Sequence, residues 1–409
     1  TGSGFEYFYG FVAGETSQYY PAIYEGTTPV EQDKLPEEGY HFTEDMTNKA
    51  ITWIRQQKSL MPDKPFFIYY APGATHAPHH VPKEWADKYK GKFDQGYEKL
   101  REEILERQKA LGVVPPDCDL SPWNEEVPLW DEIPDDMKPV LARQMEVYAG
   151  FLEHTDYHIG RMVDALEDLE VLDDTLIYYI IGDNGASAEG TPNGCFNEIA
   201  VLNGMGTIET PEFLMSKIDD FGGPEASNHY AVGWAHAMDT PYQWTKQVAS
   251  HWGGTRNGTI VHWPNGIQAK GEIRSQFSHV IDIAPTVLEA AGLPAPTIVN
   301  SVQQAPYEGV SMLYAFDDAE AAVERRGVGD QISRRVDELG VNDVVRGQDA
   351  EHREFGIHAV HAEVVPADQA PLRGGRLGGG HGGKEKGGDA AVNEAFARGD
   401  HEGSPVFPK

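Results

Sequence analysis

The chain has 409 residues, of which 40% are hydrophobic, enough for a real core in two or three domains or in one large α/β domain with an appendage. Its 65 acidic residues outnumber 33 basic ones and leave a net charge of -32, which argues against a nucleic-acid or anionic-membrane partner because the average surface repels both. For the same reason, a site for an anionic substrate would need a bound cation or a few focused basic side chains.

The first third of the chain predicts two helices and one strand. Thr43 can cap a helix whose first turn holds Glu44 and Asp45. The run 65–70 follows as a short continuous apolar segment, the pattern of a buried strand. Residues 94–111 predict a highly charged helix, and the prolines that come after it mark a surface excursion.

The middle of the chain predicts its longest helix, which begins near Asp135. Two further buried strands follow, over residues 176–181 and 258–262. A short helix from Pro285 to Ala291 starts with proline and is followed by Gly292, the asymmetry expected of helix ends. Helices that alternate with apolar strands predict an α/β fold, with a mostly parallel sheet sandwiched between helices.

The composition changes sharply after about residue 318. All eight Trp and all eighteen Tyr precede this point, and the basic residues shift from 7 Arg and 14 Lys before it to 9 Arg and 3 Lys after it. Residues 374–388 are mostly glycine with scattered charge, which cannot bury enough apolar surface to become ordered. We therefore predict a globular catalytic domain over 1–318 and a Gly/Arg-rich tail over 319–409, either disordered or read in a shifted frame.

The first candidate for chemistry is the turn 182–185, which contains Asp183 and Asn184 and directly follows the strand predicted at 176–181. In open parallel sheets, ligands bind at the carboxyl ends of strands. A carboxylate beside an amide carbonyl offers hard oxygen ligands suited to Ca²⁺ or Mg²⁺, and flanking glycines permit a tight turn. The alternative is a plain hairpin turn, which Asn-Gly favours, although residues 186–190 do not alternate as a return strand would.

The second candidate is the histidine loop that follows the strand predicted at 65–70. His76 could donate a proton to a leaving group or bind an anionic oxygen, and an incidental loop histidine is the equal alternative. For His79 and His80 the incidental interpretation is favoured, because no third ligand follows at a spacing typical of zinc.

The third candidate is Lys246, which precedes Gly253, Gly254 and the predicted strand 258–262. A lysine near a glycine pair could hold an anionic ester, with the backbone close by. The alternative is a solvated lysine on the surface, which is the usual place for this residue. His251, in the same segment, could be structural.

The two cysteines, Cys118 and Cys195, are too few for a disulfide framework, and neither has the Cys-x-x-Cys spacing of a zinc site. We expect two ordinary thiols, with one bridge between them as the alternative. No apolar run is long enough to span a membrane. The chain starts at Thr1 without an initiator Met or a signal-peptide pattern, so we expect it to begin inside a longer protein, and its location stays open.

Taken together, several segments in one order resemble the sulfatase family of the alkaline-phosphatase-like superfamily, and bacterial arylsulfatases in particular. These segments are Gly4–Thr16, Thr75–Pro78, Tyr148–Arg161, Ile181–Gly185, Thr240–Pro264 and His279–Gly292. The resemblance covers about 1–318. It implies the alkaline-phosphatase-like α/β fold, and hydrolysis of a small-molecule sulfate ester to an alcohol or phenol and sulfate.

The resemblance also implies roles for the candidate residues. Asp183 and Asn184 would supply two of four side-chain ligands to a calcium ion. His76 would contact the sulfate and could protonate the leaving phenolate, and Lys246 would neutralise charge on the sulfate oxygens. The lysine stands one residue further from the glycine pair than in the commonest family pattern, and Trp252 replaces a frequent glutamate.

Other parts of the family's site have no counterpart in this sequence. The nucleophile is a formylglycine made within a Cys/Ser-x-Pro-x-Arg motif, which neither Cys118 nor Cys195 fits. The family's paired aspartates and a Lys-x-His element would lie upstream of Thr1. We therefore expect a domain incomplete at its N-terminus and an inactive chain. The alternatives are a phosphodiesterase or phosphonate monoester hydrolase of the same superfamily, or a non-catalytic fragment or pseudoenzyme.

Overall fold

A computed structural model describes residues 4–182, 184–322 and 361–363 of the chain, so most of the predicted tail 319–409 lies outside the described residues. The helices are α1 (Phe42–Leu60), α2 (Lys83–Asp87), α3 (Tyr97–Leu111), α4 (Lys138–Asp168), α5 (Glu198–Leu202), α6 (Pro211–Ser216), α7 (Val232–Met238), α8 (Ile283–Ala290) and α9 (Leu313–Phe316). The strands are β1 (Tyr9–Gly10), β2 (Ile23–Glu25), β3 (Thr28–Val30), β4 (Ile177–Ile181), β5 (Gly258–His262), β6 (Ile273–Arg274), β7 (Ile298–Val299), β8 (Val302–Gln303) and β9 (His361–Glu363).

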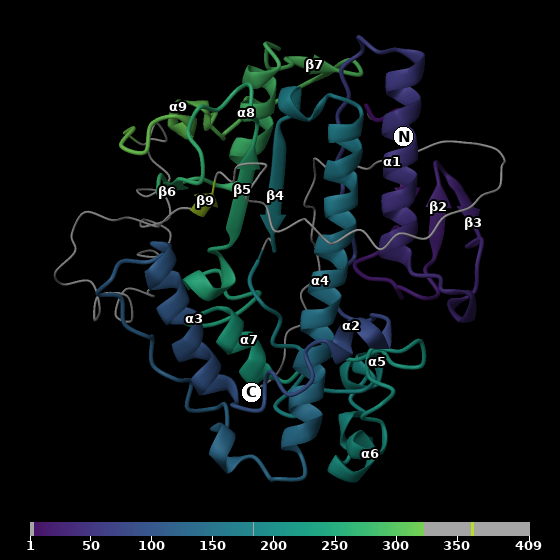
Figure 1. The fold of residues 1–409 in the computed structure, drawn as a ribbon, viewed down its shortest axis with the longest axis vertical. Coiled ribbons are helices and arrows are strands. Elements are labelled where there is room, and N and C mark those ends of the chain that lie inside the picture. The colour runs from purple at the N-terminus through teal and green to yellow at the C-terminus, as the bar shows by residue number, and fades with distance from the viewer. Residues whose placement is uncertain (1–3, 183, 323–360, 364–409) are drawn as a thin grey trace.

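The two longest helices, α1 and α4, lie side by side along the molecule (Figure 1). Both were predicted, but the cap of α1 was assigned to the wrong residue. The ring of His41, not the side chain of Thr43, accepts a hydrogen bond from the helix, at 3.3 Å from the Thr43 backbone nitrogen. The reason is that Thr43 is itself buried in the first turn, where its hydroxyl bonds to Gln18. No helix in the described ranges has both the length and the apolar composition needed to cross a membrane.

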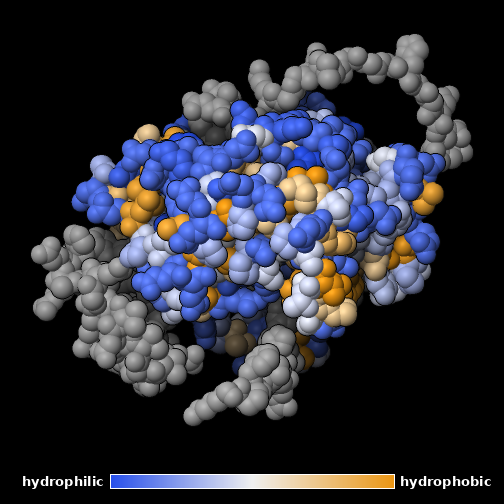
Figure 2. Space-filling view, turned by 90° about the horizontal axis from the view of Figure 1, so that it is seen from below, coloured by the Kyte–Doolittle hydropathy of each residue, from blue (hydrophilic) through white to orange (hydrophobic). Residues whose placement is uncertain are grey.

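Helices α3 and α7 pack on each other, and residues of α4 share their hydrophobic core, which is rich in aromatic rings. The Tyr97 ring lies edge-on to Trp234 and Trp130, with centroids 4.7 and 4.9 Å apart, the geometry that aromatic quadrupoles favour. All three rings are buried. The face of the molecule seen from below is largely hydrophilic, with apolar groups in scattered patches (Figure 2). That surface agrees with the high acidic content of the chain.

The predicted strands at 176–181 and 258–262 are confirmed as β4 and β5, and they pair with each other in antiparallel register from Ile177↔His262 to Ile181↔Gly258. The predicted burial of the first strand is wrong: β4 lies at the edge of the described sheet, and Ile180 and Ile181 are 39% and 44% exposed. Among the strands of the described residues, only β5 and β9 pair in parallel. The predicted mostly parallel sheet is therefore not confirmed there. The antiparallel pairing has a consequence for the site: the carboxyl end of β4 lies beside the amino end of β5.

The predicted buried strand at 65–70 is wrong as a strand, because this segment joins no sheet among the described residues. Its side chains are half-buried on one side and exposed on the other. Phe66 and Ile68 pack on the α1–α4 layer, whereas Phe67 and Tyr69 are 53% and 46% exposed. A continuous apolar run predicts burial on both sides, but here the second side has no covering element in the described structure.

Candidate active site

The loop that leaves β4 is packed against the segment that enters β5. The backbone N–H of Lys246 donates to the carbonyl of Ala186 at 2.9 Å, and the N–H of Gly185 donates to the side chain of Asn257 at 3.0 Å. Gly185 has a φ of +79°, and a Cβ built on it would lie only 1.9 Å from the carbonyl oxygen of Gly253. Two segments singled out in the sequence are therefore in direct backbone contact, and glycine is required where they meet.

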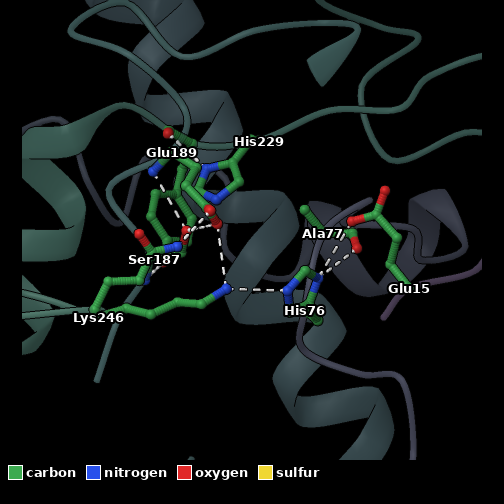
Figure 3. A network of polar contacts seen from close by, with 9 residues as sticks. Glu15, His76, Ala77, Ser187, Glu189, His229 and Lys246 are labelled. Atoms are coloured by element: carbon green, nitrogen blue, oxygen red, sulfur yellow. Dashed lines mark hydrogen bonds and ion pairs between the residues drawn. The ribbon is translucent and has the colours of Figure 1, made fainter. Parts of the chain in front are cut away.

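His76 and Lys246, which are 170 residues apart in the sequence, meet at this place (Figure 3). The Nζ atom of Lys246 lies 3.1 Å from Nε2 of His76. The histidine loop is tied to α4 by Thr75, whose hydroxyl donates to the hydroxyl of Tyr148 at 3.0 Å. The two residues that were predicted to act on the ester thus form one contact pair.

The hydrogen bonds around His76 assign its tautomer. A lysine ammonium carries donors only, so Nε2 of His76 must accept from Lys246 and must hold a lone pair. The proton of the neutral ring is then on Nδ1, which donates to the carbonyl of Ala77 at 2.8 Å. A carboxylate oxygen of Glu15 lies 3.7 Å from the same Nδ1 atom. The ring is therefore fixed from behind, and its basic nitrogen faces the lysine.

Glu189 is a member of this site that sequence reasoning missed. One of its carboxylate oxygens lies 3.2 Å from Nζ of Lys246 and accepts from the Ser187 hydroxyl at 2.7 Å, and the other accepts from Gln247 at 2.8 Å. Burial alone would raise the pKa of Glu189, but the hydrogen bonds from Ser187 and Lys246 and the lysine charge lower it below the ordinary value. The sequence signal that could have identified Glu189 was its position, five residues after the predicted metal ligand Asn184.

The proposed metal ligands are only partly described. Asp183 lies outside the described residues, and Asn184 is exposed just beyond the end of β4. Among the residues that the structure does describe, no group of three or more His, Cys, Asp or Glu side chains could hold a metal ion. A carboxylate with an amide oxygen fits a hard divalent cation in chemical kind, but two such ligands do not fill the six to eight positions of calcium.

The carboxyl group of Asp239 holds the loop that follows β4 in place. The side chain of Asp239 accepts from the backbone N–H of Ala186 at 3.0 Å, and its other oxygen is buried without a hydrogen-bond partner among the described residues. Burial raises the pKa of Asp239 to about 8, although the hydrogen bond from Ala186 opposes this shift. Asp239 therefore holds the loop in place and does not reach the His76–Lys246 pair through any described contact.

The remaining candidate histidines have structural surroundings. His80 is buried, accepts from the Gln18 backbone at 3.2 Å, and lies 2.6 Å from the carbonyl of Ala226. His79 is equally buried and stacks on the Tyr230 ring. These contacts support the incidental interpretation for both. His251 is partly exposed and lies 2.9 Å from the Ser250 hydroxyl.

The cysteines take no part in the site. Both are free thiols, as expected, and no disulfide joins them. Cys195 is fully buried, and its backbone pairs with that of His229 in an isolated bridge. Burial raises the pKa of the Cys195 thiol well above its ordinary value, with smaller contributions from Glu209 and Glu198. A protonated, buried thiol of this kind is inert as a nucleophile.

Comparison with known proteins places this geometry in context. A family model described as sulfatase matches residues 1–293. An uncharacterized sulfatase of Schizosaccharomyces pombe is 33% identical over 244 residues, which are 59% of this chain and 42% of that protein. An arylsulfatase of Klebsiella aerogenes is 28% identical over 321 residues, 76% of this chain and 65% of that protein. The chain thus spans less than two thirds of the length of either relative.

Among solved structures, one determined in complex with its substrate D-glucosamine-2-N,6-O-disulfate is 15% identical, with a TM-score of 0.43. The match covers 78% of this chain and 60% of that chain.

Proposed function

Because the chain belongs to the sulfatase family, a family of sulfuric ester hydrolases with the alkaline-phosphatase-like α/β fold, we propose that His76 and Lys246 form part of a site for hydrolysing a sulfate ester of the arylsulfatase type. The family match over 1–293 lies inside the catalytic domain that we propose for 1–318. The observation that carries the proposal is the 3.1 Å contact between Lys246 Nζ and His76 Nε2. This contact places the positive charge of Lys246 next to His76, which can transfer a proton.

In this proposal Lys246 binds a sulfate oxygen of the ester. Its side chain is only 16% exposed, so its charge is screened less than that of a surface lysine. The chain as a whole carries a net charge of -32, which makes a focused cation necessary for holding an anion. Charge-assisted hydrogen bonds from an ammonium to an anionic oxygen are among the stronger polar contacts in proteins.

His76 handles the proton of the leaving group. In the tautomer assigned above, Nε2 is unprotonated, so it must gain a proton before it can give one to the leaving phenolate oxygen. The His76 side chain is 41% exposed, so solvent can supply that proton while Lys246 keeps its positive charge. The bond from Nδ1 to the Ala77 carbonyl holds the ring in the orientation that this transfer requires.

Asp183 and Asn184 would hold a divalent cation, which we propose to be calcium because both side chains offer hard oxygen ligands. When bound, such a cation supplies Lewis-acid charge that stabilises negative charge developing on the ester.

We expect the 409-residue chain to bind 4-nitrophenyl sulfate without hydrolysing it faster than buffer does. Binding follows from the His76–Lys246 pair, and the lack of turnover follows from the absence of a Cys/Ser-x-Pro-x-Arg motif anywhere in the sequence. Calorimetric titration measures the first, and release of 4-nitrophenolate measures the second. Failure to reach saturable binding would refute the proposed site, and turnover that is abolished by Asp183→Ala would refute the predicted inactivity.

A further inference from the structure

We propose that Glu189 determines the charge of the ester that the His76–Lys246 site accepts, by selecting a monoanion over a dianion. This inference rests on the proposed sulfate-ester site and concerns its discrimination between sulfate and phosphate monoesters. The two kinds of ester have the same shape about the central atom, so a protein must distinguish them largely by charge.

The position of Glu189 is fixed independently of any ligand (Figure 3). Ser187 and Gln247 hold its two carboxylate oxygens at 2.7 and 2.8 Å, and Lys246 Nζ lies 3.2 Å from the first of them. Its side chain is 39% exposed, so the carboxylate sits at the edge of the site and is neither deeply buried nor free in solvent. An anion that binds to Lys246 therefore has to bind next to a carboxylate that is already in place.

The described side chains around this point carry no net positive charge. Lys246 carries one positive charge, Glu189 carries one negative charge, and His76 is neutral because its Nε2 accepts from the lysine. Glu15 lies behind His76 at 3.7 Å from Nδ1, on the side away from Lys246, and the buried Glu198 interacts electrostatically with both Glu189 and Lys246. Both are carboxyl groups and add no positive charge.

Because the two esters differ in charge, the Glu189 carboxylate affects their binding to different extents. A sulfate monoester carries one negative charge, whereas a phosphate monoester carries nearly two above its second pKa of about 6. The second charge of a bound phosphate ester lies across the lysine ammonium from the Glu189 carboxylate, at roughly 6 Å. At that distance and an intermediate effective dielectric, the repulsion between two unit charges weakens binding about tenfold. Glu189 thus disfavours the phosphate ester without a steric clash. The divalent cation proposed at Asp183 and Asn184 would attract both esters, so the contribution of Glu189 is the change in the ratio of their affinities when its charge is removed.

The test compares 4-nitrophenyl sulfate with 4-nitrophenyl phosphate at about pH 8, where the phosphate is a dianion. Both are titrated calorimetrically into the full chain and into Glu189→Gln, which keeps the shape of the side chain and removes its charge. We expect the wild-type chain to prefer the sulfate ester, and Glu189→Gln to shift the ratio of the two affinities about tenfold toward the phosphate.

Two control variants isolate the charge of Glu189. Gln247→Ala removes a hydrogen bond to the carboxylate but leaves its charge, so the ratio should change less than twofold. Glu102→Gln removes a carboxylate from another lysine ion pair, with Lys99 on α3, and should leave the ratio unchanged. If Glu189→Gln does not fold, Glu189→Ala carries the same prediction, and thermal unfolding identifies which variant is usable.

The outcomes separate this inference from the function on which it rests. If the wild-type chain binds neither ester, the proposed sulfate-ester site is refuted, and the inference falls with it. If the wild-type chain binds the sulfate ester and removal of the Glu189 charge changes both affinities by the same factor, Glu189 only positions Lys246. That result overturns the inference and leaves the proposed function intact.

Discussion

Replacing Gly185 by alanine is expected to lower the free energy of unfolding by about 3 kcal/mol or more. Two penalties add at this position. The backbone has a φ of +79°, which a residue with a Cβ adopts only at a cost, and the new Cβ would lie 1.9 Å from the Gly253 carbonyl oxygen. Since that neighbour is backbone, it cannot swing aside, and the loop after β4 must move away from the segment that carries Lys246.

Gly182, in the same loop, provides the matched control. Its φ is +74°, but a Cβ there meets nothing closer than Asn257 Oδ1 at 3.7 Å. Gly182→Ala should therefore cost only the backbone strain, about 1 kcal/mol. Urea unfolding of the two variants beside the wild-type chain measures the difference. Equal losses for both variants would show that the loop does not press on Gly253 as described.

Replacing Lys246 by alanine is expected to weaken the binding of 4-nitrophenyl sulfate about 100-fold, which corresponds to about 2.7 kcal/mol. A hydrogen bond to a charged group contributes about 1.5–3 kcal/mol, and Lys246 is the cation that contacts His76. The substitution also leaves Glu189 without its lysine partner, so an uncompensated carboxylate would repel the ester.

The control for this change is Lys217→Ala, which removes a lysine that pairs with Asp220 at 2.8 Å on another part of the surface. Its effect on the affinity should be less than twofold. Calorimetric titrations at the same ionic strength compare the variants, because screening by salt weakens any charge contribution. An affinity that survives Lys246→Ala unchanged would remove this residue from the site.

Local patterns identified most of the elements that frame the site. The apolar runs at 176–181 and 258–262 are strands, and the long helix predicted from Asp135 is α4. Both predictions depend on the spacing of apolar side chains, which is read directly from the sequence. The relative direction of the strands depends on how 76 residues between them return to the sheet, and no local pattern encodes that path. For this reason the antiparallel pairing was not predicted.

The site was predictable to the extent that its residues stand in recognisable segments. His76 and Lys246 were singled out by the resemblance and by their places near predicted strands, and the structure brings them together. Glu189 was not, because an acidic residue in a loop resembles any solvated carboxylate until its partners Ser187 and Gln247 are known. A carboxylate's role depends on its neighbours in space, which the sequence order does not supply.

The most direct test of the His76–Lys246 site is to locate the sulfur atom of 4-nitrophenyl sulfate by anomalous diffraction from crystals of the chain soaked with this ester. We expect one sulfur position with an ester oxygen about 3 Å from Lys246 Nζ, on the side of the lysine that faces His76, and with the lysine still beside Glu189. A sulfur bound elsewhere, with the contact between Lys246 and His76 undisturbed and no ester oxygen near either, would contradict it.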